Sequence, residues 1–121
     1  GIQRLISLTG RLPAHDIAER MGMEVVLYRW DASRLPPREQ LHQVVGQMKE
    51  PKITAVHCMA GADRTGYAVA SYRFFVEEWS YQRAIDEMPY YWHLIPNFPR
   101  LHKQLRTFLV RSDDIAVSAK P

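Results

Sequence analysis

A short segment, residues 56–66, brings together a cysteine, an arginine, a threonine and two glycines. The β-branched run before it predicts a strand that ends at His57, and the pattern after it predicts a helix that begins near Arg64 or Thr65. A helix N-terminus presents unpaired N–H groups and a partial positive charge, so it binds anions. Gly61 has no Cβ where the loop must turn tightly or approach a ligand closely. The segment therefore predicts a loop whose amides converge on one anion.

Cys58 stands at the base of this loop, and its thiol is the candidate nucleophile. The loop amides and the helix dipole stabilise a thiolate, so we expect the pKa of the Cys58 thiol to lie below its ordinary value. Arg64 closes the loop and can hold two phosphate oxygens with its planar fork. The hydroxyl of Thr65 can reach back to the sulfur, and Gly66 lets the helix start pack close to the sheet. His57 points to the other side of the strand, where it orients the loop rather than touching a substrate.

The segment resembles the signature His-Cys-x-x-Gly-x-x-Arg-Thr-Gly of the cysteine-dependent protein tyrosine and dual-specificity phosphatases, and in particular their compact atypical dual-specificity group. All six fixed positions match: His57, Cys58, Gly61, Arg64, Thr65 and Gly66. The resemblance implies a phosphomonoester hydrolase that works through a phosphocysteine intermediate, with no metal and no cofactor. It also implies that phosphate is bound by the loop residues Met59, Ala60, Gly61, Ala62, Asp63 and Arg64.

The family also uses an aspartate as general acid, on a mobile loop after the preceding strand. Asp31 follows Trp30 at the end of a predicted strand, and loops at the carboxyl ends of such strands meet at the site. The pair is similar to the family's Trp-Pro-Asp loop, although no proline separates the two residues. Asp63 is the alternative acid, because a protonated carboxyl in the loop could donate to a leaving group.

Strand patterns alternate with helix patterns along the chain. This order predicts an α/β single domain with a central, mostly parallel sheet flanked by helices on both faces, as in the phosphotyrosine phosphatases. The predicted strands are 2–8, 24–30 and 53–57. The predicted helices are 13–21, 37–50, 65–79, 81–88 and a last helix capped by Asn97, with an aromatic loop over 89–92. We expect the phosphatase-like domain over 1–111, with an upstream strand missing, and a polar tail over 112–121.

The composition of the chain argues against several other classes of protein and of binding site. The chain has 121 residues, a net charge of +3 and one cysteine. This length suits one domain, and this charge is too small to indicate nucleic acid. One cysteine excludes an internal disulfide and a four-cysteine zinc site, and the histidines lack metal-ligand spacing. No apolar run is long enough for a transmembrane segment. The cytoplasm is favoured, and export remains open because an upstream segment could be missing; the oligomeric state is also open.

The expected partner is a phosphorylated protein or a small phosphomonoester. The leading prediction is hydrolysis of phosphotyrosine and phosphoserine or phosphothreonine in proteins. A phosphoinositide or inositol phosphate is the alternative substrate, although inositide-directed members often carry an extra lysine in the loop where this chain has Ala62. From other classes we considered a pseudophosphatase that binds a phosphorylated ligand, and a redox or sulfur-transfer enzyme. Arsenate reduction through protein disulfides needs further cysteines, which the chain lacks.

Overall fold

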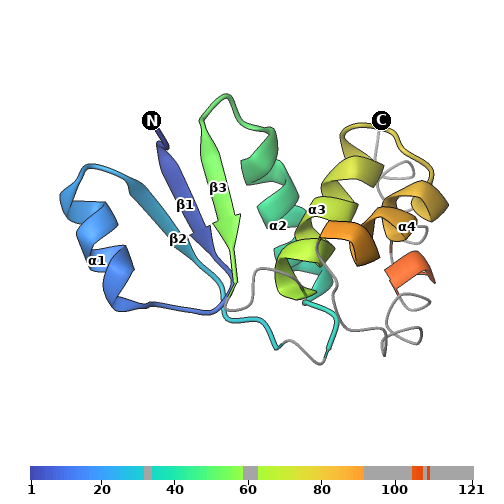
Figure 1. Ribbon diagram of the computed structural model, residues 1–121, viewed down its shortest axis with the longest axis horizontal. Helices are drawn as coiled ribbons and strands as arrows, with labels where there is room; N and C mark the ends of the chain where they lie inside the picture. The colour runs from blue at the N-terminus through green and yellow to red at the C-terminus, as the bar shows by residue number, and fades with distance from the viewer. Residues whose placement is uncertain (32–33, 59–62, 92–104, 108, 110–121) are drawn as a thin grey trace.

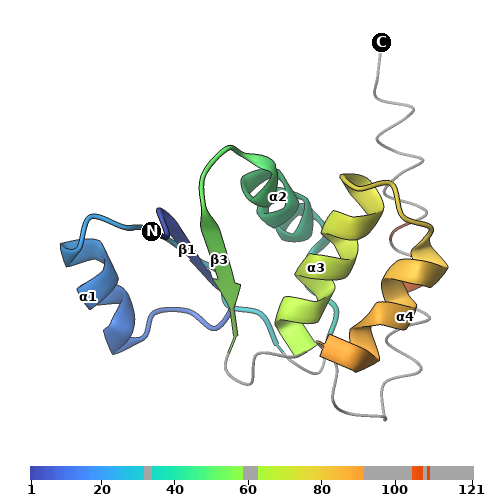
Figure 2. The same cartoon turned by 45° about the horizontal axis from the view of Figure 1, so that its top comes forward.

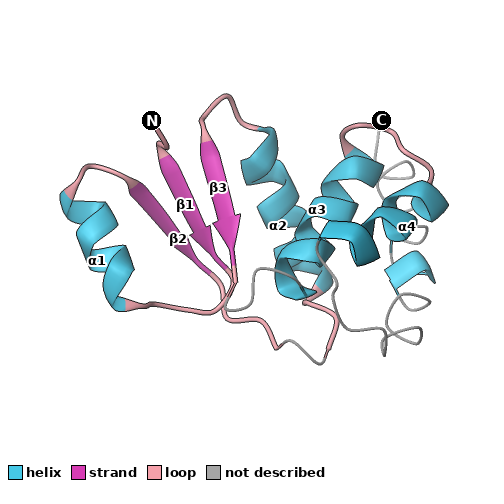
Figure 3. Cartoon of the chain, viewed as in Figure 1, coloured by secondary structure: helices cyan, strands magenta, loops and turns pink. Residues whose placement is uncertain are grey.

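Three parallel strands form the centre of the protein (Figures 1 and 3). The computed structural model describes residues 1–31, 34–58, 63–91, 105–107 and 109. The strands are β1 (Arg4–Ser7), β2 (Glu24–Leu27) and β3 (Thr54–His57), in the order β2-β1-β3. Each strand is shorter than the apolar run that predicts it. The parallel sheet is confirmed.

The helices cover the sheet on both faces, as predicted. Among the helices that the structure describes, α1 (Pro13–Arg20) alone lies on one side, and α2 (Arg38–Lys49) and α3 (Asp63–Phe75) lie on the other (Figures 1 and 2). Helix α4 (Tyr81–Tyr91) packs on the outer side of α3. This arrangement places α3 between the sheet layer and α4, and it explains why α3 carries apolar residues around most of its surface.

The main core lies between the sheet and helices α2 and α3. Ile6 of β1, Val44 of α2, and Tyr67 and Ala68 of α3 are all fully buried there. Successive side chains of a strand point to opposite faces, so Ile6 faces α2 while its neighbours face α1. Residues 105–107 and 109 are helical, and Leu105 and Leu109 are fully buried, as expected for the apolar stripe of the last helix.

Two helix ends differ from the prediction by three residues or more, and the other ends of α1 to α4 agree within two residues. Helix α3 ends at Phe75 rather than at residue 79, because Glu78 adopts a positive φ of 59° and the Trp79 amide bonds back to the Arg73 carbonyl at 2.9 Å. Glycine usually fills such a position, so the sequence gives no stop signal here. Helix α4 continues through Pro89 to Tyr91, where we predicted a loop. Proline fixes φ near the helical value, so the last turn can form with the loss of one hydrogen bond. The predicted tail over 112–121 lies outside the described residues.

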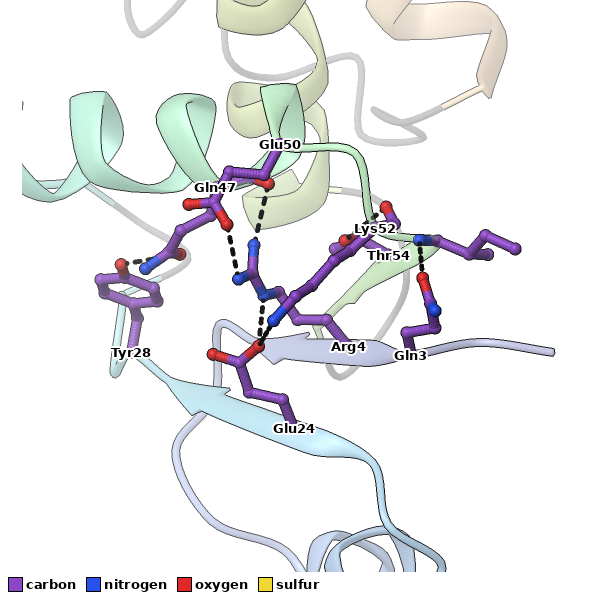
Figure 4. Close-up of polar contacts among 9 residues, drawn as sticks. Gln3, Arg4, Glu24, Tyr28, Gln47, Glu50, Lys52 and Thr54 are labelled. Atoms are coloured by element: carbon purple, nitrogen blue, oxygen red, sulfur yellow. Dashed lines mark hydrogen bonds and ion pairs between the residues drawn. The ribbon is translucent and has the colours of Figure 1, made fainter.

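A buried arginine ties the amino ends of the strands to α2 (Figure 4). The side chain of Arg4 is 5% exposed and donates to Glu24 at 3.0 Å, to the Gln47 carbonyl at 3.0 Å and to Glu50 at 2.8 Å. Lys52 adds a second contact to Glu24 at 2.9 Å. This network stabilises the edge of the sheet opposite the carboxyl ends of the strands.

Candidate active site

The carboxyl ends of the three strands are tied together by backbone hydrogen bonds. The Leu8 amide, just after β1, donates to the His57 carbonyl at 2.9 Å. The Trp30 amide, beyond β2, donates to the Leu8 carbonyl at 2.9 Å. Gly10 then turns the chain away with a φ of 81°, which a side chain would strain. Cys58, directly after His57, and Asp31, directly after Trp30, therefore emerge at the same edge of the sheet.

Cys58 and Thr65 are in direct contact. The Thr65 hydroxyl, in the first turns of α3, donates to Cys58 Sγ over 3.2 Å. Cys58 is 8% exposed and Thr65 is 4% exposed, so water screens this contact little. The sulfur also lies near the amino end of α3, whose partial positive charge favours an anion. Gly66 is buried beside them in the same helix. The Thr65 hydroxyl thus reaches the sulfur, as the sequence led us to expect, and this geometry favours a thiolate at Cys58.

Arg64 connects α3 to the segment that carries Asp31. Its Nη1 donates to the Trp30 carbonyl at 3.1 Å. Its Nε is buried and has no hydrogen-bond partner among the residues that the structure describes. A buried donor without a partner is uncommon in folded proteins, and a guanidinium donor of this kind suits an anionic oxygen.

Asp31 lies on the surface. It directly follows Trp30, whose carbonyl accepts a hydrogen bond from Arg64. Its Oδ2 is 3.8 Å from Arg34 Nε, and both side chains are exposed. The preceding residue is anchored firmly, because the buried indole of Trp30 donates to Gln40 at 2.8 Å. The structure therefore brings Asp31 to the edge of the site. The rival acid, Asp63, begins α3, but its side chain is not described, and Met59, Ala60, Gly61 and Ala62 lie outside the described residues.

His57 contacts a residue that the sequence analysis did not place near the site. His15, on α1, has its Nε2 2.9 Å from Nε2 of His57, and the two ring centroids are 5.1 Å apart. His15 is 1% exposed. The signal available in the sequence was its position at the start of a helix that follows β1, since such a helix begins near the carboxyl ends of the strands. No group of three or more potential metal ligands occurs among the described residues. Within the same residues, no helix combines the length and apolar character needed to cross a membrane.

Comparison with known proteins gives likenesses in structure alone. No protein-family model matches the chain, and no curated protein matches it. PTPMT1 matches over 97% of this chain and 82% of its own, with a TM-score of 0.73 and 21% identity. Its complex with PI(5)P matches with a TM-score of 0.70 and 21% identity over 95% and 81% of the two chains.

Two other solved structures show the same likeness. Tk-PTP in the active form matches over 88% of this chain and 79% of its own, with a TM-score of 0.70 and 22% identity. TpbA from P. aeruginosa, in complex with pTyr, matches over 73% of this chain and 55% of its own, with a TM-score of 0.63 and 22% identity. The arrangement of strands and helices around Cys58 is therefore the fold of the protein tyrosine phosphatases.

Proposed function

We propose that the chain is a cysteine-dependent phosphomonoesterase of the protein tyrosine and dual-specificity phosphatase type. The observation that carries this proposal is the buried contact between Thr65 Oγ1 and Cys58 Sγ at the amino end of α3, with Arg64 directly before Thr65. A nucleophile, a hydroxyl donor to it and a guanidinium fork at one helix end form a combination suited to a phosphate group. The fold supports the proposal, because Tk-PTP and PTPMT1 share it, as does a structure from Leishmania major that is named a protein tyrosine phosphatase (putative).

In the first chemical step, the Cys58 thiolate attacks phosphorus and the bond from phosphorus to the leaving oxygen breaks. The leaving oxygen takes a proton from Asp31. In the second step, water loses a proton to the Asp31 carboxylate and attacks phosphorus, and the cysteine leaves as a thiolate with the hydroxyl of Thr65 donating to it. Arg64 and the loop amides stabilise the charge on the equatorial oxygens in both steps.

The proposed substrates are phosphotyrosine and phosphoserine or phosphothreonine in proteins. The structure of TpbA holds pTyr, and it supports this class by its similar fold. A phosphoinositide is the second candidate. It is supported by the structure of PTPMT1 in complex with PI(5)P, which matches 95% of this chain at a TM-score of 0.70, against 73% and 0.63 for TpbA. Initial rates on a phosphotyrosine peptide, a phosphoserine peptide and vesicles containing PI(5)P, measured side by side, distinguish the two.

The assignment of the acid is tested by varying the leaving group. A general acid matters most for a poor leaving group, because an acidic phenol leaves almost unaided. We expect Asp31→Asn to lower kcat/KM about a hundredfold or more on alkyl and phenyl phosphates, and far less on a strongly activated aryl phosphate. It should also remove the high-pH limb of the profile of kcat/KM against pH.

Asp63→Asn is the matched control for this experiment. It should change all substrates about equally, since its effect would be on phosphate affinity and the loop. If Asp63→Asn shows the dependence on leaving group and Asp31→Asn does not, the acid is Asp63. Cys58→Ser should retain phosphate binding with less than about a thousandth of the activity, because a hydroxyl without a base is a poor nucleophile. Activity close to that of the parent in Cys58→Ser would reject the proposed function.

A further inference from the structure

Two histidine rings meet behind Cys58, on the face of the sheet that α1 covers. His57 is the last residue of β3 and is directly bonded to Cys58 in the chain. His15 reaches it from α1, with 2.9 Å between the two Nε2 atoms. His15 is buried and His57 is partly buried, so the contact is largely shielded from water. The reaction described above uses neither ring directly.

The backbone N–H of Leu12 determines which ring nitrogens of neutral His15 and neutral His57 carry a proton. The Leu12 amide donates to Nδ1 of His15 at 2.7 Å. A backbone N–H can only donate, so Nδ1 of His15 must carry a lone pair. Neutral His15 then has its proton on Nε2, and it donates to Nε2 of His57. Neutral His57 must in turn carry its proton on Nδ1, the ring nitrogen nearer to its own backbone.

We propose that His15 is a positioning residue that holds His57 in the Nδ1–H tautomer and thereby keeps a hydrogen-bond donor beside the peptide that joins His57 to Cys58. The consequence for catalysis rests on the proposed function, whereas the tautomer does not. A second proton on His15 would place its Nδ1–H against the Leu12 N–H, so that two donors would face each other. The contact with Leu12 therefore favours a neutral His15.

The charges around His15 agree with a neutral ring. Burial, followed by the nearby His57 and Arg11, lowers the pKa of His15, and Asp16 and Glu19 oppose this. Arg11 is itself paired with Asp16 at 2.8 Å and with Glu19 at 2.7 Å. The strand residues that face α1 from β2, Val25 and Leu27, are apolar. His15 thus has no close, unpaired carboxylate among the described residues that would favour its charged form.

Two substitutions at one position separate the contacts of His15. In His15→Asn the amide can still accept from the Leu12 N–H, but it ends too far from His57 to donate to it. In His15→Gln the longer side chain separates an acceptor from a donor much as the imidazole does, so it can restore the contact with His57. His42→Gln is the matched control, because His42 is an exposed histidine of α2 that contacts Phe75.

The first measurement is the ¹⁵N NMR spectrum of the histidine rings at neutral pH, which reports the tautomer of His57 without any need for activity. We expect the Nδ1–H form in the parent, in His15→Gln and in His42→Gln. We expect a mixture that includes the Nε2–H form in His15→Asn, because water replaces His15 there and permits either tautomer. An Nε2–H form in the parent, or an unchanged His57 in His15→Asn, would overturn the assignment of the tautomer.

The second measurement is the kinetics of phosphate hydrolysis by the same proteins. Loss of one hydrogen bond behind the nucleophile should lower kcat about three- to tenfold in His15→Asn with KM nearly unchanged. His15→Gln should recover most of this loss, and His42→Gln should match the parent. An altered tautomer with unchanged kcat would overturn the role of His15 in catalysis. A parent without activity would instead reject the proposed function, and the NMR result would still decide the tautomer.

Discussion

The hydrogen bond from Thr65 to Cys58 offers a sharp test of the site, because one substitution removes it with little change in shape. Thr65→Val replaces the hydroxyl by a methyl group and leaves the sulfur without this donor. The bond is 3.2 Å long, and both residues are more than nine-tenths buried, so water cannot easily replace the donor. Thr65→Ser keeps the hydroxyl and is the matched control.

The expected effect follows from the strength of a hydrogen bond to a charged group. Such a bond contributes about 1.5–3 kcal/mol. At about 1.4 kcal/mol for each factor of ten, its loss lowers the thiolate population about ten- to a hundredfold wherever the thiol is mostly protonated. Alkylation by iodoacetate at mildly acidic pH should fall less, about three- to tenfold, because a more basic thiolate is a better nucleophile.

The assay uses the fact that Cys58 is the only cysteine of the chain. The ultraviolet absorbance of the thiolate, followed against pH, therefore reports this residue alone, with Cys58→Ser as the blank. The midpoint should move to higher pH in Thr65→Val and stay close to that of the parent in Thr65→Ser. Equal midpoints in the parent and in Thr65→Val, with both proteins folded, would refute the view that the hydroxyl stabilises a thiolate.

Three further predictions concern charge and stability. Arg64→Lys keeps the charge but loses the fork and the contact with the Trp30 carbonyl, so steady-state kinetics should show a severe loss mainly in kcat. Arg4→Met should lower the free energy of unfolding in urea by about 2 kcal/mol, below the usual 3–5 kcal/mol for a broken buried ion pair, because both glutamates are about half exposed. Burial lowers the pKa of His15, so the unfolded chain binds more protons than the folded one below about pH 6.5. The free energy of unfolding therefore decreases as the pH is lowered through that range. His15→Gln should make the decline of Tm between about pH 7 and 5 shallower, and a slope as steep as that of the parent would contradict this. Burial lowers the pKa of His42 as well, so His42→Gln measures the contribution of His42 separately.

The sequence predicts those parts of the fold that depend on local patterns. Apolar runs indicated each strand, and helix periodicity indicated each helix, so the order of elements and the parallel sheet are confirmed. The predicted ends of the helices were less accurate where tertiary contacts determine where a helix stops. Helix α3 stops at Phe75 because Glu78, which is not a glycine, adopts a left-handed conformation. Helix α4 passes through Pro89, a residue that usually marks an end.

The candidate site shows the same division. The contact of Thr65 with Cys58 could be predicted because both residues lie on one strand–loop–helix unit whose geometry follows from the local sequence. The contact of His15 with His57 joins residues 42 positions apart. It depends on how α1 lies across the sheet, which no local pattern determines. A histidine near the start of a helix also has common structural explanations, so its residue type alone could not indicate this role.

The segment around Asp31, the proposed acid, is held by contacts between residues distant in sequence. The family's loop has a proline between tryptophan and aspartate, and proline restricts the backbone by itself. This chain has no residue between Trp30 and Asp31. Trp30 is instead held from both ends, by Gln40 on its indole and by Arg64 on its carbonyl, at 2.8 and 3.1 Å. Since Arg64 is also the proposed phosphate ligand, binding of phosphate and the position of Asp31 should depend on each other, and loss of this arginine should weaken both.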